Sequence, residues 1–234
     1  MNKNIILASS STVYGSGYLE YLMPRLSAFF KRVNTILFIP YARPSGISYD
    51  EYTQIASKAF TKIDKNVIGI HEFENSKEAL LKAEGVFVGG GNTFELVNQL
   101  YKNDIVDVLK VTVENGTPYL GTSAGSNIAG ISMMNTNDMP VVYPPSFKTL
   151  GLIPFNINAH YFDADPNSKH MGETRETRIK EFHIYNDTPV VGLKEGSWLE
   201  VLGDNIILEG ELSAKLFLKN AKPIDIKFKS KINL

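Results

Sequence analysis

The chain has 234 residues, with 24 lysines and arginines against 25 aspartates and glutamates, and it contains no cysteine. This length suits one large domain, and the near-neutral charge lacks the basic excess of a nucleic-acid-binding protein. The lack of cysteine excludes disulfides, thiolate metal sites and a cysteine nucleophile. The first apolar run is too short for a signal peptide, and no run has transmembrane length, so we expect a cytoplasmic protein that binds no membrane.

In the first half of the chain, short apolar runs alternate with segments of helical periodicity. The predicted strands are residues 5–8, 35–39, 66–69, 85–88 and 117–121, and the predicted helices are residues 19–30, 49–63, 76–83 and 104–114, with another that begins at Asn92. Pro24 is expected to kink the first helix or to open its second part. This alternation predicts a mostly parallel sheet with helices on both faces.

The second half of the chain is predicted to be richer in strands. Its short β-prone runs are residues 139–142, 157–159, 190–193, 198–202, 206–208, 216–218 and 224–228, and residues 173–185 form its clear helix. No linker, repeat or low-complexity segment separates the two halves. We therefore expect a single α/β domain over residues 1–234.

The segment Gly121–Gly125 has the pattern Gly-x-Ser-x-Gly and follows an apolar run. A strand that turns sharply into a helix at this pattern presents its serine, here Ser123, as a nucleophile. The two glycines are required because a Cβ at either position would collide with the neighbouring strand or with the helix. By itself the pattern fits an ordinary strand–helix connection equally well.

A second glycine cluster, residues 89–91, follows the predicted strand at 85–88. After it, Asn92 and Glu95 have the spacing of a capping box at a helix N-terminus. In open parallel sheets, ligands bind at the carboxyl ends of the strands. The glycine cluster and Ser123 are therefore expected to face the same crevice.

Backbone amides at a helix N-terminus form a natural anion site. We favour an oxyanion site made by the amides of Gly90, Gly91 and Ala124. A tight turn without further function is the alternative. A phosphate-binding loop is disfavoured because the cluster lacks a Gly-Lys-Ser/Thr ending and a Gly-x-Gly-x-x-Gly pattern.

A serine nucleophile needs a base, and the chain has four histidines. His160 ends the run at 157–159, at a predicted strand carboxyl end, where a catalytic role and a structural one are equally open. His71 lies in a turn-like segment. His183, in a charged helix, is expected to be solvated or packed, and His170, in a polar loop, is expected to be exposed to solvent.

Glu195 follows the predicted strand at 190–193, where its carboxylate would hold an imidazole in the right tautomer. A surface-turn glutamate is the competing and simpler interpretation. The chain order Ser, His, Glu differs from that of the α/β-hydrolases, but triads are defined by geometry rather than order. No His-x-x-x-His or His-Glu-x-x-His pair is present, so we expect no metal site.

Six segments of the chain resemble, in the same order, the peptidase E family of α-aspartyl dipeptidases. They are residues 88–94, 121–125, 135–140, 158–160, 172–178 and 192–198. Six collinear matches are far more specific than any one motif. The resemblance begins at the first strand and is weak beyond the last of these segments.

The resemblance implies a flavodoxin-like three-layer fold akin to the class I glutamine amidotransferases, with serine in place of their cysteine. It implies a peptidase that cleaves dipeptides with an N-terminal aspartate and needs no metal or cofactor. It assigns Ser123 as nucleophile, His160 as base and Glu195 as orienting acid. The expected partner is a small peptide, and the expected assembly is a monomer or a homodimer.

An N-terminal aspartate carries a β-carboxylate and an α-ammonium. The carboxylate calls for the planar fork of an arginine, and Arg175 in the matching segment is our first choice, with Arg178 second. The ammonium calls for a carboxylate, which Asp138 or Glu173 would supply. For each of these side chains a solvated surface role is the alternative.

Thr122 departs from the family pattern, which has tryptophan before the serine. A smaller residue there would widen the pocket or shift the preference for aspartate. Two alternative functions follow from the same residues. One is a cyanophycinase-like β-aspartyl peptidase, and the other is a non-catalytic amidotransferase-like binding protein.

Overall fold

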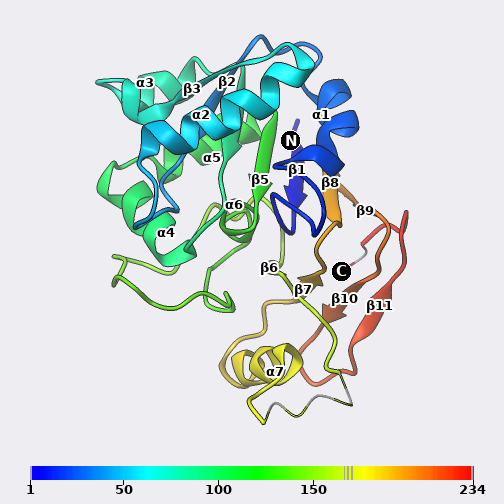
Figure 1. Cartoon of the computed structure of the whole chain (residues 1–234). Coiled ribbons are helices and arrows are strands. Elements are labelled where there is room, and N and C mark those ends of the chain that lie inside the picture. The colour runs from blue at the N-terminus through cyan, green and yellow to red at the C-terminus, as the bar shows by residue number, and fades with distance from the viewer. Residues whose placement is uncertain (1, 166, 168, 170, 233) are drawn as a thin grey trace.

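The main sheet of the computed structural model has seven strands in the order β3-β2-β4-β5-β1-β8-β9 (Figure 1). The structure describes residues 2–165, 167, 169, 171–232 and 234. The strands are β1 (Asn4–Ala8), β2 (Thr35–Ile39), β3 (Asn66–Gly69), β4 (Gly85–Val88), β5 (Tyr119–Thr122), β8 (Trp198–Leu202) and β9 (Asn205–Glu209). β1 to β5 are mutually parallel, whereas β8 and β9 are antiparallel to their neighbours. The strands β3-β2-β4-β5-β1 correspond, in this order, to strands 2-1-3-4-5 of the flavodoxin-like fold, so β1 takes the place of the fifth flavodoxin strand.

A layer of helices covers each face of this sheet. Alternate side chains of β1 pack against the one layer and the other. Ile6 and Ala8 pack in one apolar cluster with α1 (Met23–Phe29) and α2 (Tyr49–Phe60). Ile5 and Leu7 point to the opposite face and pack in a second cluster. That second cluster includes residues of α3 (Ser76–Leu81), α4 (Thr93–Lys102), α5 (Val106–Glu114) and α6 (Ala124–Asn127).

A second, smaller sheet has the strand order β11-β10-β7-β6 and lies beyond the carboxyl ends of the main-sheet strands (Figure 1). Its strands are β6 (Asn156–Ala159), β7 (Val190–Leu193), β10 (Ala214–Phe217) and β11 (Ile224–Ile226). β6 and β7 are parallel, and the other two pairs are antiparallel. α7 (Arg175–Tyr185) packs on this sheet through Ile179 and Phe182.

The predicted fold class, a mostly parallel sheet with helices on both faces and extra strands toward the C-terminus, is confirmed. Three short 3₁₀ turns, η1 (Glu20–Leu22), η2 (Thr61–Ile63) and η3 (Ile70–Glu72), complete the first half. Pro24 lies at the start of α1, after η1, so it opens the second part of that segment. Across the described ranges, no helix has both the length and the apolar character to cross a bilayer.

The strand predicted at residues 139–142 does not form, because this segment is a loop. Pro140 has no amide to donate to a neighbouring strand, and Met139 and Val141 are 77% and 55% exposed. The Met139 carbonyl instead accepts a hydrogen bond from the side chain of Asn92. The apolar composition of this run therefore reflects neither burial nor strand pairing.

Candidate active site

Ser123 lies between the last residue of β5 and the first residue of α6, with φ 52° and ψ −110°. A serine rarely adopts a positive φ, so neighbouring contacts must hold this conformation. The Ser123 amide donates to the Ala8 carbonyl at the end of β1 (3.0 Å). The turn therefore fixes the serine at the carboxyl edge of the main sheet.

The two glycines that flank Ser123 permit the close packing of this turn. A Cβ on Gly121 would lie 2.5 Å from the Gly125 carbonyl oxygen, and a Cβ on Gly125 would overlap the Val88 carbonyl of β4. The predicted need for glycine at both positions is thus confirmed, since the first would strike the helix and the second the neighbouring strand.

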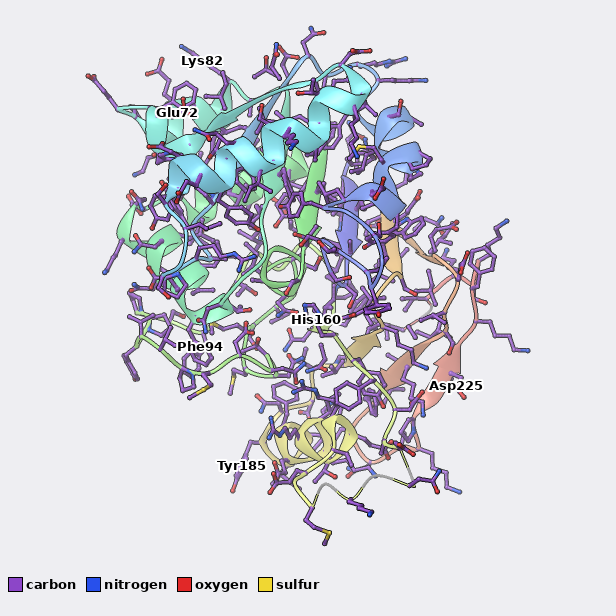
Figure 2. The ribbon with its side chains drawn as sticks, in the orientation of Figure 1. Glu72, Lys82, Phe94, His160, Tyr185 and Asp225 are labelled. Carbon is purple, nitrogen blue, oxygen red and sulfur yellow. The ribbon has the colours of Figure 1, made fainter. Side chains whose placement is uncertain are left out.

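His160 directly follows β6, and its Nε2 lies 2.9 Å from Ser123 Oγ. Its Nδ1 lies 2.6 Å from Glu195 Oε1, just beyond β7. Because a carboxylate accepts hydrogen bonds, this contact favours a proton on Nδ1 and leaves the Nε2 lone pair to accept from the serine hydroxyl. Figure 2 shows His160 between the main sheet and the second sheet. The arrangement is chemically competent for general-base activation of a serine.

The glycine cluster after β4 lies against Ser123. A Cβ on Gly90 would be 3.0 Å from Ser123 Cβ, and the Gly90 carbonyl accepts a hydrogen bond from the buried Tyr52 hydroxyl (3.0 Å). Within the described part of the chain, the amides of Gly90, Gly91 and Ala124 donate to no protein acceptor. These amides are therefore available to an anion beside the serine hydroxyl.

Asn92 caps α4, and its side chain accepts from the Glu95 amide (3.1 Å). The second hydrogen bond of the predicted capping box would join the Asn92 amide to the Glu95 side chain. The Glu95 carboxylate instead accepts from the side chains of two later residues of the helix. Asp138 reaches the same helix start, where its Oδ2 accepts from the Thr93 amide (2.7 Å) and from the Thr136 hydroxyl (3.0 Å). One carboxylate oxygen of Asp138 is thus committed to the N-terminus of α4.

Arg175, the first residue of α7, lines a cavity of about 410 Å³ together with Phe162, Asn137 and the pair Glu173 and Arg178. Its guanidinium carbon lies 5.3 Å from the centre of the Phe162 ring. Its Nε is buried and has no hydrogen-bond partner among the described residues. Burial lowers the pKa of Arg175, nearby Arg178 lowers it further, and Asp138 opposes both. A half-buried guanidinium with a buried Nε, at the wall of a cavity, is suited to an anionic ligand.

The other residues predicted at the site differ in their surroundings. Arg178 and Glu173 are exposed and face each other at 4.0 Å. Thr122 is fully buried, and its hydroxyl has no partner among the described residues. His71 pairs with Asp50 at 2.8 Å, away from Ser123.

His183 contacts the Thr188 carbonyl at 3.0 Å, so it has a packing role. His170 lies outside the described residues. Ser9 and Tyr52 also belong to the surroundings of the site, and the sequence analysis missed both. For Ser9 a signal was available, because it directly follows the strand at 5–8 and so lies at a strand carboxyl end.

Comparison with known proteins extends this description. The model of peptidase family S51 matches residues 5–209. The chain is 46% identical over 223 residues to a peptidase E of Streptomyces coelicolor, covering 95% of this chain and 90% of that protein. It is 45% identical over 218 residues to a probable α-aspartyl dipeptidase of Drosophila melanogaster, covering 92% of this chain and 90% of that protein.

The fold also has a solved counterpart. The crystal structure of a peptidase from an acI-B1 Actinobacterium superposes with a TM-score of 0.68 at 16% identity. The superposition covers all of this chain and 98% of that one. At this level of identity, the likeness concerns the fold alone.

The packing around the serine turn predicts the effect of Gly125→Ala. The added methyl would overlap the Val88 carbonyl, so the free energy of unfolding should fall by about 2 kcal/mol or more. Urea denaturation measures this change. In the control Gly17→Ala, the methyl would meet only the flexible, exposed side chain of Glu20, and the change should stay within about 0.5 kcal/mol. Equal stability of the two variants would contradict the packing argument.

Proposed function

The chain belongs to peptidase family S51, and we propose that it is an α-aspartyl dipeptidase whose chemistry depends on Ser123, His160 and Glu195. The observation that carries the assignment of residues is the continuous chain of contacts from Ser123 Oγ through the imidazole to Glu195, at 2.9 and 2.6 Å. The geometry is that of a nucleophile, a base and an orienting acid.

In the proposed reaction, Ser123 Oγ attacks the carbonyl carbon of the scissile peptide bond while His160 Nε2 takes the hydroxyl proton. The imidazolium then gives this proton to the nitrogen of the leaving residue, and the C–N bond breaks. An acyl-enzyme between Ser123 and the aspartyl group remains. A water molecule, deprotonated by His160, hydrolyses this ester and releases aspartate.

Glu195 keeps the Nδ1 proton in place and stabilises the imidazolium that forms during attack. The negative charge on the former carbonyl oxygen requires fixed donors. Gly90 lies against Ser123, Gly91 and Ala124 follow Gly90 and Ser123 directly in the chain, and the amides of all three, which have no acceptor among the described residues, would supply these donors. Because these are backbone groups of a rigid turn, they need little rearrangement as the charge develops.

The recognition of aspartate is assigned to the cavity at the start of α7. The buried Nε of Arg175 has no partner among the described residues, and the guanidinium would pair with the substrate β-carboxylate. Asp138 is close enough to raise the pKa of Arg175, and its second oxygen would receive the α-ammonium. Arg178 and Glu173 neutralise each other at the rim, so they contribute less.

The nucleophile assignment predicts that Ser123→Ala lowers kcat on Asp-Leu by about 10⁶-fold, because no other hydroxyl contacts His160 Nε2 among the described residues. Release of leucine measures this loss. Ser197→Ala is a suitable control, since among the described residues that buried hydroxyl bonds to the Leu212 carbonyl alone. Full hydrolysis by Ser123→Ala would refute the mechanism.

Glu195→Gln is expected to lower kcat by about 10⁴-fold, because an amide in place of the carboxylate no longer holds the reactive tautomer of His160. Asp138→Asn, at a carboxylate that contacts α4 and not the imidazole, should mainly raise KM. Steady-state kinetics with Asp-Leu separates the two. The assignment of the orienting acid is wrong if Asp138→Asn loses more kcat than Glu195→Gln.

Arg175→Met is expected to raise KM for Asp-Leu about 100-fold, which corresponds to about 2.7 kcal/mol for a lost charge-assisted pair. Arg178→Met is the matched control, and KM should change by less than about threefold because that guanidinium is exposed. A panel of Asp-Leu, Asn-Leu, Glu-Leu and β-Asp-Arg checks the specificity. Unchanged discrimination between Asp-Leu and Asn-Leu in Arg175→Met would contradict the proposed recognition.

A further inference from the structure

Ser9, the residue after β1, lies where the main sheet meets the second sheet. Its side chain is fully buried, with 0% exposed surface. Its Oγ donates to the Leu193 carbonyl at the end of β7 (2.7 Å) and accepts from the His160 amide (2.9 Å). One hydroxyl therefore joins the ends of three strands that belong to two sheets.

The orientation of this hydroxyl is fully determined. A serine has one proton to donate, and the Leu193 carbonyl takes it, so the lone pairs of Ser9 Oγ are left for the His160 amide. The Leu193 carbonyl also accepts from the Tyr161 amide (3.1 Å), one residue beyond the histidine. Residues 160 and 161 are thus fixed against both Ser9 and β7.

His160 needs such support because its backbone has φ 54°. A histidine in this region is uncommon, and the conformation persists only where neighbouring groups hold it. φ is the rotation about the bond between the amide nitrogen and Cα, and the amide that Ser9 holds is that of His160 itself. The hydroxyl therefore restrains the direction in which the imidazole leaves the backbone.

The neighbouring backbone of Ser9 contacts the other two reacting segments. The Ser9 amide donates to the Ser197 carbonyl (3.0 Å), and the Ser197 amide donates to the Lys194 carbonyl (3.1 Å), which closes the turn that contains Glu195. The preceding carbonyl, of Ala8, accepts from the Ser123 amide (3.0 Å). The end of β1 is therefore in direct contact with all three segments that carry the reacting side chains.

We propose that Ser9 is a positioning residue, whose hydroxyl holds the His160 backbone so that Nε2 faces Ser123 Oγ. Among the described residues, its hydroxyl hydrogen-bonds to no reacting atom and to no residue of the cavity at the start of α7, so it determines kcat rather than KM. This inference rests on the proposed function of Ser123 and His160, but it is independent of the identity of the substrate.

The test compares Ser9→Ala with the wild-type chain in two assays. The first is the rate at which a serine-directed fluorophosphonate labels Ser123, and the second is the steady-state hydrolysis of Asp-Leu. We expect the labelling rate and kcat to fall by about 10- to 100-fold, the range that a misplaced catalytic group produces, while KM stays within about twofold. A kcat within twofold of the wild type, or a loss that lies in KM, would overturn the proposal.

A matched control separates positioning from a general loss of stability. Thr112→Val removes another buried hydroxyl, which bonds to the Leu80 carbonyl between α5 and α3, away from the site. Its stability should fall, with the labelling rate and kcat of the folded protein unchanged. A fall in the labelling rate similar to that of Ser9→Ala would assign the effect to stability and overturn the proposal.

Ser9→Cys keeps a weak donor and acceptor at the same place, so it is expected to retain a kcat between those of Ser9→Ala and the wild type. If Ser9→Ala does not fold, Ser9→Cys decides the question: a lowered kcat at unchanged KM supports the role of Ser9, and a kcat equal to that of the wild type refutes it.

A wild-type chain that reacts with the fluorophosphonate but leaves Asp-Leu intact contradicts the proposed substrate alone. In that case the labelling rate still tests Ser9.

Discussion

The backbone of Ser123, held at positive φ between β5 and α6, is the constraint on which the rest of the site depends. It persists because backbone packs directly on backbone at Gly121 and Gly125, and because the Ala8 carbonyl holds the serine amide. Once this turn is set, the hydroxyl projects from the carboxyl edge of the sheet. Among the described residues, His160 reaches this hydroxyl from the end of β6, a strand of the second sheet.

Elements whose apolar residues are all buried could be predicted from the sequence almost residue for residue. β2, β4 and β7 are examples, since in a strand covered on both faces the apolar run is itself the burial pattern. The run at 139–142 has a similar composition, yet it is an exposed loop. The apolar composition of a segment indicates a tendency to be buried. It does not indicate whether a helix or strand elsewhere in the fold covers that segment.

The residues of the site likewise divide into those that the sequence could predict and those that it could not. Ser123, His160 and Glu195 could be predicted because each lies at a strand end within a recognisable segment. The capping of α4 by Asp138 spans 45 residues, and the hydrogen bond from the His160 amide to Ser9 spans 151. Such contacts depend on how separate strands and loops meet in three dimensions, so no local periodicity or spacing records them. Arg175 is an intermediate case. Its residue type predicted an anionic ligand, whereas the burial of its Nε is visible only in the structure.

The central place of β1 has a consequence for the synthesis of the protein. β1 precedes both of its partners along the chain, β5 and β8, so the main sheet stays open at β1 until residues 198–202 have been made. Pairings between such distant segments form slowly, and an unpaired β1 exposes apolar surface until then. We therefore expect a nascent chain that has not yet reached β8 to lack the complete site, because the end of β1 contacts the segments of all three reacting side chains.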